Sequence, residues 1–248
     1  SSHNRETVLR HFEWMREYGI DGAFIQRFAN GLRRPGFTKH KDIVLTHARE
    51  GANRNGRAYA VMYDLSGLPK GGVDGVREDW IRLRTEMHVT EDAAYLKHEG
   101  RPLVSPWTVG RYRDEETVSR HVEKYWQPDE DWCAERSLDF LPVVFPGFSW
   151  YHLKGGDLGA IPRQKGAFLW SQIAEAKRIG SDMIYVAMFD EVDEGTAIFK
   201  CVNNPPSGDG LPFLDYEGLP SDYYLMLVGE AGRLLRGERE LTEGQLEW

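Results

Sequence analysis

Residues 182–196 read DMIYVAMFDEVDEGT, an apolar run followed at once by four carboxylates within five residues. The run 182–189 has the length and the β-branched and aromatic content of a buried strand. Carboxylates crowded at the end of such a strand repel one another and lose water, and a chain rarely accepts both for packing alone. The stretch therefore predicts a chemical centre at the carboxyl end of a strand.

The rest of the chain alternates helices with apolar strands. Periodicity and end signals predict helices at about 5–18, 39–53, 76–87, 115–125, 165–178 and 222–236. Apolar runs predict further strands at 21–28, 58–64, 101–107 and 140–145. This alternation indicates an α/β fold in which helices cover a parallel sheet.

Polar residues and Gly/Pro-rich loops follow the predicted strands rather than precede them. A (β/α)8 barrel of the TIM type places its active site at that end of its strands. An open doubly wound sheet also binds ligands there, but no Gly-x-Gly-x-x-Gly follows any predicted strand. We therefore predict a (β/α)8 TIM-barrel type, with residues 1–248 forming a single catalytic domain.

The number of strands falls short of a closed barrel. Five are predicted, whereas a TIM barrel needs eight, and the chain opens with a helix. Either further strands lie within 90–100 and 201–214, or the first part of the barrel precedes this chain. The second alternative is favoured, so we expect a barrel that is incomplete at its N-terminus.

Composition limits the class of partner. The chain of 248 residues has a net charge of −8, which argues against nucleic acid as the main partner. The longest uncharged apolar runs are only strand-length, so no membrane span is expected. The two cysteines, Cys133 and Cys201, could pair but say little about the redox compartment. No signal peptide begins the chain, and the oligomeric state stays open.

Glu191 and Glu194 are the strongest candidates for chemistry within the acidic stretch. Residues three apart in a strand point to opposite faces, so these two share a pocket only if the backbone turns, for which Gly195-Thr196 is suited. Two carboxyls in one pocket push their pKa values apart, which gives the acid and the base that glycosidic cleavage requires. A solvated acidic loop or a calcium site would use the same residue types.

The segment 189–196, FDEVDEGT, resembles the Phe-Asn-Glu-Trp-His-Glu-Gly-Thr motif of glycoside hydrolase family 99, the endo-α-mannosidases, and of the wider 71/99-like group. Other segments that agree in order and spacing are HFEWM (11–15) with YGIDG (18–22), FPGFSW (145–150), IPRQ (161–164) with FLW (168–170), and YYL (223–225). The resemblance covers most of the chain. It implies a glycosidase barrel with an upstream portion, and it favours a secreted or periplasmic protein.

Carried over by position, the resemblance implies that Glu194 is the general acid/base on the glycosidic oxygen. Glu191 would be the partner carboxylate that deprotonates the sugar 2-hydroxyl, in a retaining route on an α-linked, mannoside-like oligo- or polysaccharide. The family's Asn, Trp and His are Asp190, Val192 and Asp193 here. The added negative charge could raise the pKa of the acid further or recruit a cation, so calcium in the acidic loop is a possible cofactor, although none is expected to be required.

Several other side chains lie at or just past predicted strand ends and are candidates for sugar contacts. Aromatic rings suit the apolar face of a pyranose, and polar groups suit its hydroxyls, although loop packing explains any one of them equally well. The predicted substrate-binding residues are Arg27, Tyr63, Asp64, Trp107, Trp150, Tyr151, His152, Arg163, Asp190 and Asp193. The alternatives to a glycosidase are a catalytically inactive barrel that binds carbohydrate and a barrel that holds calcium.

Overall fold

A computed structural model describes residues 2–69, 71–102, 104–106, 113–205 and 211–242. Its contacts group the chain into two compact units, Ser1–Thr108 and Val109–Trp248. Each unit has its own strands, helices and core. The prediction that residues 1–248 form a single domain stays a prediction.

The first unit is built on a parallel sheet of strand order β1-β2-β5. Its strands are β1 (Gly22–Phe28), β2 (Ala58–Asp64) and β5 (Val104–Pro106). Gly22 pairs with Ala58, and a Cβ at Gly22 would lie 2.2 Å from the Ala58 carbonyl oxygen. Glycine is therefore what lets the first two strands begin side by side.

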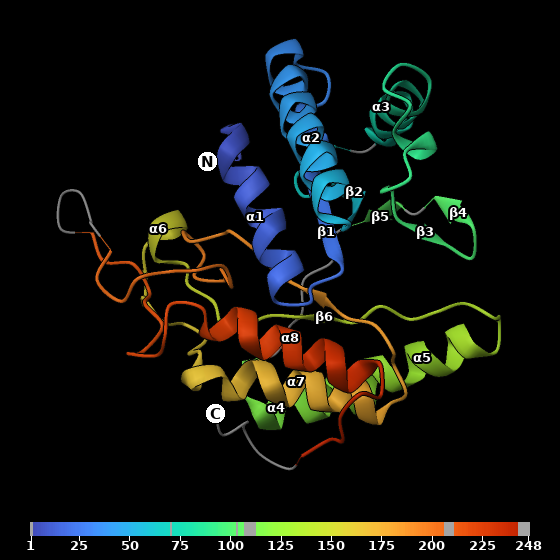
Figure 1. Cartoon of the computed structure of the whole chain (residues 1–248). Helices are drawn as coiled ribbons and strands as arrows, with labels where there is room; N and C mark the ends of the chain where they lie inside the picture. The colour runs from blue at the N-terminus through green and yellow to red at the C-terminus, as the bar shows by residue number, and fades with distance from the viewer. Residues whose placement is uncertain (1, 70, 103, 107–112, 206–210, 243–248) are drawn as a thin grey trace. The chain divides into compact units, whose positions relative to one another are not determined.

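Three long helices accompany this sheet: α1 (Arg5–Glu17), α2 (Pro35–Asn55) and α3 (Val73–Thr85). The Asn4 side chain caps α1 by accepting a hydrogen bond of 3.1 Å from the backbone N–H of Thr7. Helices α1 and α2 lie side by side (Figure 1), and Phe12 of α1 sits over Gly51 of α2, where a Cβ would be 2.6 Å from its ring. The shorter elements of this unit are η1 (Ala29–Gly31), η2 (Val89–Glu91), β3 (Lys97–His98) and β4 (Arg101–Pro102).

The second unit is mainly helical. Its helices are α4 (Glu115–His121), α5 (Gln127–Ala134), α6 (Tyr151–Lys154), α7 (Ala167–Arg178) and α8 (Tyr223–Leu235), with η3 (Val122–Trp126) and η4 (Gln164–Gly166). Strands β6 (Val143–Val144) and β7 (Tyr185–Val186) form a short parallel pair. Helix α7 packs against α4, α8 and β6 (Figure 1).

A buried glutamine fixes the end of β6 to α7. The Gln172 side chain donates to the Phe145 carbonyl oxygen at 2.8 Å and accepts from the Phe145 N–H at 3.0 Å. Both backbone groups of Phe145 are thereby satisfied where the strand ladder stops. The loop that leaves β6 toward Trp150 therefore starts from a fixed point.

The predicted alternation of helices and strands is confirmed, and the fold class is α/β. The strands at 21–28 and 58–64 are found within one residue of their predicted bounds, whereas 140–145 and 182–189 pair over two residues each. Helix α5 was not predicted. No closed barrel forms among the described residues. Within 90–100, β3 is the only strand that they contain, beside a single parallel bridge from Tyr95 to Tyr59.

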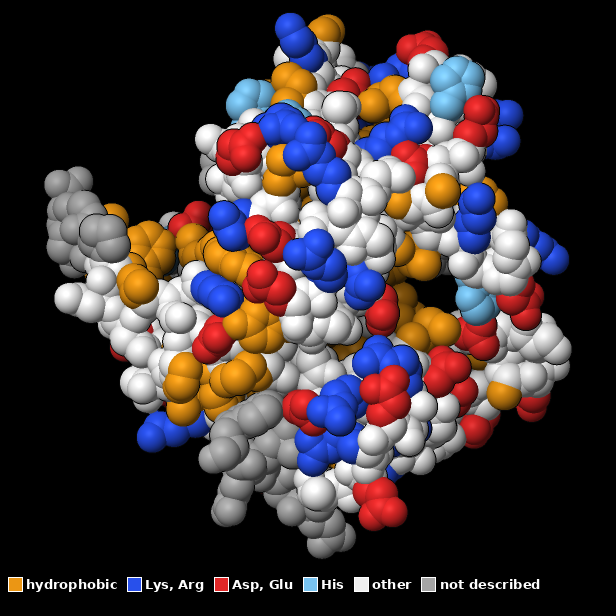
Figure 2. All heavy atoms as spheres, in the orientation of Figure 1, with side chains coloured by type: hydrophobic (Ala, Val, Ile, Leu, Met, Phe, Trp, Pro, Cys, Tyr) orange, Lys and Arg blue, Asp and Glu red, His pale blue; other side chains and the backbone are white. Residues whose placement is uncertain are grey.

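The surface carries charges of both signs. On the face shown in Figure 2, lysine and arginine side chains alternate with aspartate and glutamate, without a broad area of one sign. None of the helices in the described part of the chain is both long and apolar enough to cross a membrane.

Candidate active site

The acidic stretch forms a loop that folds back on itself after β7. The Gly195 N–H donates to the Val192 carbonyl oxygen at 3.1 Å, and the Thr196 N–H donates to the Glu191 carbonyl oxygen at 3.2 Å. Gly195 has a left-handed φ of 65°. The turn predicted from Gly195-Thr196 is therefore confirmed, and the chain between Glu191 and Glu194 does not continue as a strand.

Glu191 is half-buried, and its carboxylate lies over this turn. Its Oε1 accepts a hydrogen bond of 2.9 Å from the Asp193 N–H. Burial raises the pKa of Glu191 above its ordinary value, and the negative charges of Asp193 and Asp190 raise it further, against the opposing effect of the Asp193 and Glu194 N–H groups. A carboxylate in this state binds its proton more firmly than one in water.

Glu194 is also half-buried and is tied to the loop that follows β6. Its carbonyl oxygen accepts a hydrogen bond of 2.7 Å from the Ser149 N–H. The next residue, Trp150, is 42% exposed, and its ring meets Phe148 at 4.7 Å and the Lys154 ammonium at 4.2 Å. The partly exposed indole of Trp150 therefore belongs to the residue that directly follows the backbone contact with Glu194.

Tyr151 and His152 follow Trp150 on α6 and face a more distant segment of the same unit. The His152 Nε2 lies 2.8 Å from the Pro212 carbonyl oxygen, and its ring stacks on Phe213 with centroids 4.4 Å apart. The Tyr151 ring contacts the His152 ring edge-on. His152 therefore packs Pro212 and Phe213 onto α6, and Tyr151 lies against the His152 ring.

Arg163 is 3% exposed and lies behind the acidic loop. Its Nη2 donates to the carbonyl oxygens of Gly195 and Ala197, at 2.8 Å each. Its guanidinium also lies 4.9 Å from the Tyr216 ring centroid and 4.6 Å from that of Tyr224. The structure places Arg163 against the backbone of the loop.

Asp190 and Asp193 occupy different surroundings within the loop. Asp193 is exposed and contributes its N–H to Glu191, whereas Asp190 is half-buried near Tyr185 of β7. Burial raises the pKa of the Tyr185 phenol, and the nearby Asp190 carboxylate adds to this rise. Tyr185 was not among the predicted site residues. Its position within the predicted strand, five residues before Asp190, is the only sequence signal that could have identified it.

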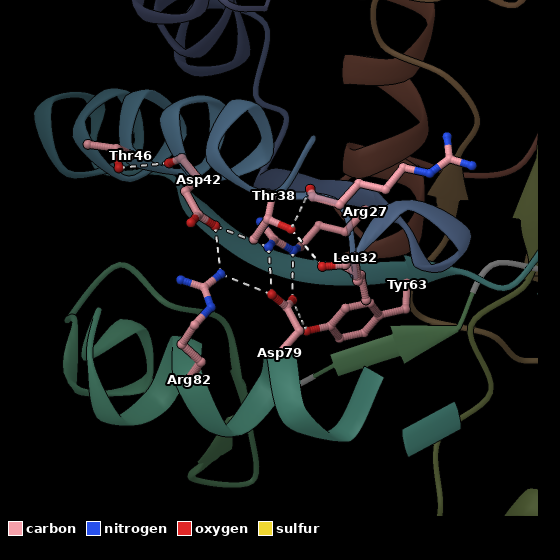
Figure 3. Close-up of polar contacts among 9 residues, drawn as sticks. Arg27, Leu32, Thr38, Asp42, Thr46, Tyr63, Asp79 and Arg82 are labelled. Atoms are coloured by element: carbon pink, nitrogen blue, oxygen red, sulfur yellow. Dashed lines mark hydrogen bonds and ion pairs between the residues drawn. The ribbon is translucent and has the colours of Figure 1, made fainter. Parts of the chain in front are cut away.

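Arg27 and Tyr63, at the carboxyl ends of β1 and β2, belong to a buried ionic network in the first unit (Figure 3). Arg27 is 0% exposed and bonds both oxygens of Asp79, at 3.0 and 2.9 Å. The Tyr63 hydroxyl donates to Asp79 at 2.7 Å, and Arg82 and Asp42 complete the network. With no exposed surface, Arg27 has a structural role in this arrangement.

Asp64 lies on the other face of the same two strands. Its carboxylate accepts hydrogen bonds from the Gln26 side chain and from the Ser66 N–H, at 2.7 Å each. Gln26 directly precedes Arg27 in β1, so strand alternation points its side chain to the opposite face of the sheet. Trp107, the remaining predicted residue, lies outside the described residues.

The sequence left a calcium site in the acidic loop as an alternative. Among the residues that the structure describes, no group of three or more His, Cys, Asp and Glu side chains is placed to hold a metal ion. The absence of a required cofactor stays a prediction.

The chain is similar in fold to solved glycosidases. The structure of the GH99 endo-alpha-mannosidase from Bacteroides thetaiotaomicron in complex with bis-tris-propane matches with a TM-score of 0.75 at 16% identity, over 96% of this chain and 86% of that chain. A second GH99 endo-alpha-mannosidase structure from that organism matches with a TM-score of 0.72 at 16% identity, over 96% of this chain and 81% of the other. A scan against protein-family models and a search of curated proteins give no match.

At 16% identity this likeness concerns the fold. It agrees with the resemblance that the segment 189–196 carries, because both of these solved structures are GH99 endo-alpha-mannosidases. The chain therefore has an α/β fold similar to that of glycoside hydrolase family 99, a family of TIM-barrel enzymes.

Proposed function

We propose that this protein is a glycoside hydrolase that cleaves an α-linked, mannoside-like oligo- or polysaccharide. The observation that carries the proposal is the Glu191 carboxylate with its raised pKa, in a turn that also bears Glu194. Perturbed carboxylates of this kind gather at functional sites more often than elsewhere. The fold likeness to GH99 endo-alpha-mannosidases supports the choice of a glycosidase over other carboxylate chemistry.

In the proposed reaction Glu194 donates its proton to the glycosidic oxygen as the bond breaks. Glu191 acts when ionised, and it takes the proton of the sugar 2-hydroxyl, whose oxygen then attacks the anomeric carbon in place of a protein nucleophile. Water then opens the resulting anhydro-sugar at the anomeric carbon, with Glu194 as the base and with Glu191 returning its proton to the 2-oxygen, so the anomeric configuration is retained. A raised pKa suits Glu191 to this role, because a carboxylate that holds its proton more firmly is the stronger base.

Neighbouring side chains would hold the sugar. Trp150 offers a partly exposed ring on which a pyranose can stack, and Asp190 and Asp193 offer oxygens to hydroxyl groups. His152 would contribute by holding the 211–214 segment, with Tyr151 against its ring.

The test is cleavage of α-mannan oligosaccharides by wild type, Glu191→Gln and Glu194→Gln. We expect each substitution to lower kcat by a factor of at least about 10³, because each removes a group that moves a proton in the transition state. Glu175→Gln, at a half-buried glutamate of α7 that pairs with Arg178, is the matched control and should cleave like wild type. Wild-type rates in both site variants would refute the assignment.

Binding separates the proposed enzyme from the carbohydrate-binding alternative. Val192 and Asp193 stand where the resembled motif has Trp and His, so a site that keeps the sugar but lacks turnover is the natural second candidate. Calorimetry with the same oligosaccharides would show binding without any product for that alternative.

A further inference from the structure

Arg163 joins the acidic loop to the helical core of the second unit. One nitrogen, Nη2, holds the carbonyl oxygens of Gly195 and Ala197 at 2.8 Å each, and these two groups lie on either side of Thr196. The Tyr216 hydroxyl donates to the same Ala197 carbonyl oxygen, at 3.2 Å. The segment that directly follows Glu194 is therefore fixed by side chains from elsewhere in the unit.

The segment is fixed on its other side as well. The Ser149 N–H holds the carbonyl oxygen of Glu194 itself at 2.7 Å. Ser149 is in turn placed by an antiparallel bridge between Phe148 and Ile161, which lies two residues before Arg163. The contacts on both sides of Glu194 thus lead back to the same short stretch of chain, 161–163.

The surroundings of Arg163 suit an arginine. Its guanidinium lies 4.9 and 4.6 Å from the centroids of the Tyr216 and Tyr224 rings, while one of its nitrogens, Nη2, makes both hydrogen bonds to the carbonyl groups. A lysine ammonium has no planar group to lie against two rings while it reaches these oxygens. Gly147 makes room for the side chain, because a Cβ there would lie 2.8 Å from the Arg163 Cγ.

We propose that Arg163 is a positioning residue that sets the place of Glu194 through the carbonyl groups of Gly195 and Ala197. At 3% exposure it has almost no surface for a sugar, so it acts through the backbone and not as a ligand of the substrate. The inference rests on the proposed function in taking Glu194 as the acid. Misplacing a catalytic group by about 1 Å can slow a reaction on the order of 100-fold, which sets the expected size of the effect.

The experiment compares Arg163→Lys with wild type by two measurements. Hydrogen–deuterium exchange should become faster at the amides of residues 194–199 and stay unchanged in α7 and α8. On α-mannan oligosaccharides, kcat should fall on the order of 100-fold while KM changes less than about threefold, because positioning acts in the transition state. The matched control is Arg239→Lys, since Arg239 also lies over an aromatic ring, that of Trp170, and pairs with Glu230. It should change neither measurement.

A second variant tests the same contact in case Arg163→Lys does not fold. Tyr216→Phe removes the hydroxyl that bonds Ala197 and Phe199 but leaves Arg163, and it should speed exchange in the same segment to a smaller degree. Unchanged exchange at 194–199 in a folded Arg163→Lys protein would overturn the inference, as would a large rise in KM at unchanged kcat. If wild type cleaves no glycoside, the proposed function fails, and the exchange measurement still decides whether Arg163 holds the loop.

Discussion

The charge on Asp193 has a predictable effect on its neighbour Glu191. After burial, it is the largest contribution that raises the pKa of Glu191. Asp193→Asn removes this charge but keeps the backbone N–H that Glu191 accepts, so the pKa of Glu191 should fall. In the proposed reaction Glu191 works when ionised, so the acidic limb of the pH profile of kcat/KM should move to lower pH.

Exposed Asp157 provides the control for this measurement. It lies in the loop after α6, and Asp157→Asn should leave the acidic limb in place. A limb that stays fixed or moves to higher pH in the Asp193→Asn variant would mean that a group other than Glu191 controls it.

The same raised pKa means that the ionised Glu191 carboxylate lowers the free energy of unfolding at neutral pH. The folded protein binds this proton more tightly than the unfolded chain, so the carboxyl favours folding below its unfolded pKa of about 4.3 and loses that contribution as pH rises through the higher folded pKa. Glu191→Gln cannot ionise, and its amide oxygen can still accept the Asp193 N–H. The variant should therefore melt at a higher temperature than wild type at pH 7, with the difference shrinking toward pH 4.

Melting curves of both proteins from pH 4 to pH 8 check this expectation. A lower melting temperature for Glu191→Gln that does not vary with pH would show that the carboxylate stabilises the loop.

At the scale of the element, the acidic loop depends on one glycine. Gly195 has a φ of 65°, and a Cβ there would lie 2.5 Å from the Leu214 Cδ1. Gly195→Ala should destabilise the protein by about 1–3 kcal/mol, from the left-handed backbone together with the overlap. In the double variant Gly195→Ala with Leu214→Ala, the steric overlap is gone but the strain of the left-handed backbone remains. A double-mutant cycle in urea should therefore show a favourable coupling between the two changes, and strict additivity would contradict this account.

Local patterns in the sequence predicted the elements of the first unit better than those of the second. The strands at 21–28 and 58–64 pair with each other over their full length, so their apolar runs match their bounds. The run at 182–189 is just as apolar but pairs only through Tyr185 and Val186, because its partner β6 is itself only two residues long. Of the other residues of the run, Ala187 is buried and Met183, Ile184, Met188 and Phe189 are half-buried without ladder pairing, which leaves the same apolar signature.

At the scale of the whole molecule, the sequence located the strand ends but not the partners of the side chains there. Arg27 and Tyr63 were predicted to contact sugar because they end strands, and they are register partners on one face of the sheet. That face meets Asp79 of α3, which is 52 residues from Arg27 in the chain. No local pattern shows which helix covers which face. By contrast, the turn between Glu191 and Glu194 was predictable, because it depends on neighbours in sequence.

The Asp79 network gives a prediction for the stability of the whole chain. Burial alone would raise the pKa of Asp79, but the charge and hydrogen bonds of Arg27, together with Tyr63 and Arg82, lower it overall, so the group stays ionised. Asp79→Asn leaves the fully buried Arg27 without its main counter-charge, and removing one partner of such a pair costs about 3–5 kcal/mol. Tyr63→Phe removes only one hydrogen bond and should cost about 1–2 kcal/mol.

The exposed neighbour Glu78 provides the control, since Glu78→Gln on the same helix should change the free energy of unfolding by less than about 0.5 kcal/mol. Urea unfolding followed by circular dichroism measures all three, and an Asp79→Asn variant as stable as Glu78→Gln would show that the network does not hold α2, α3 and the sheet together.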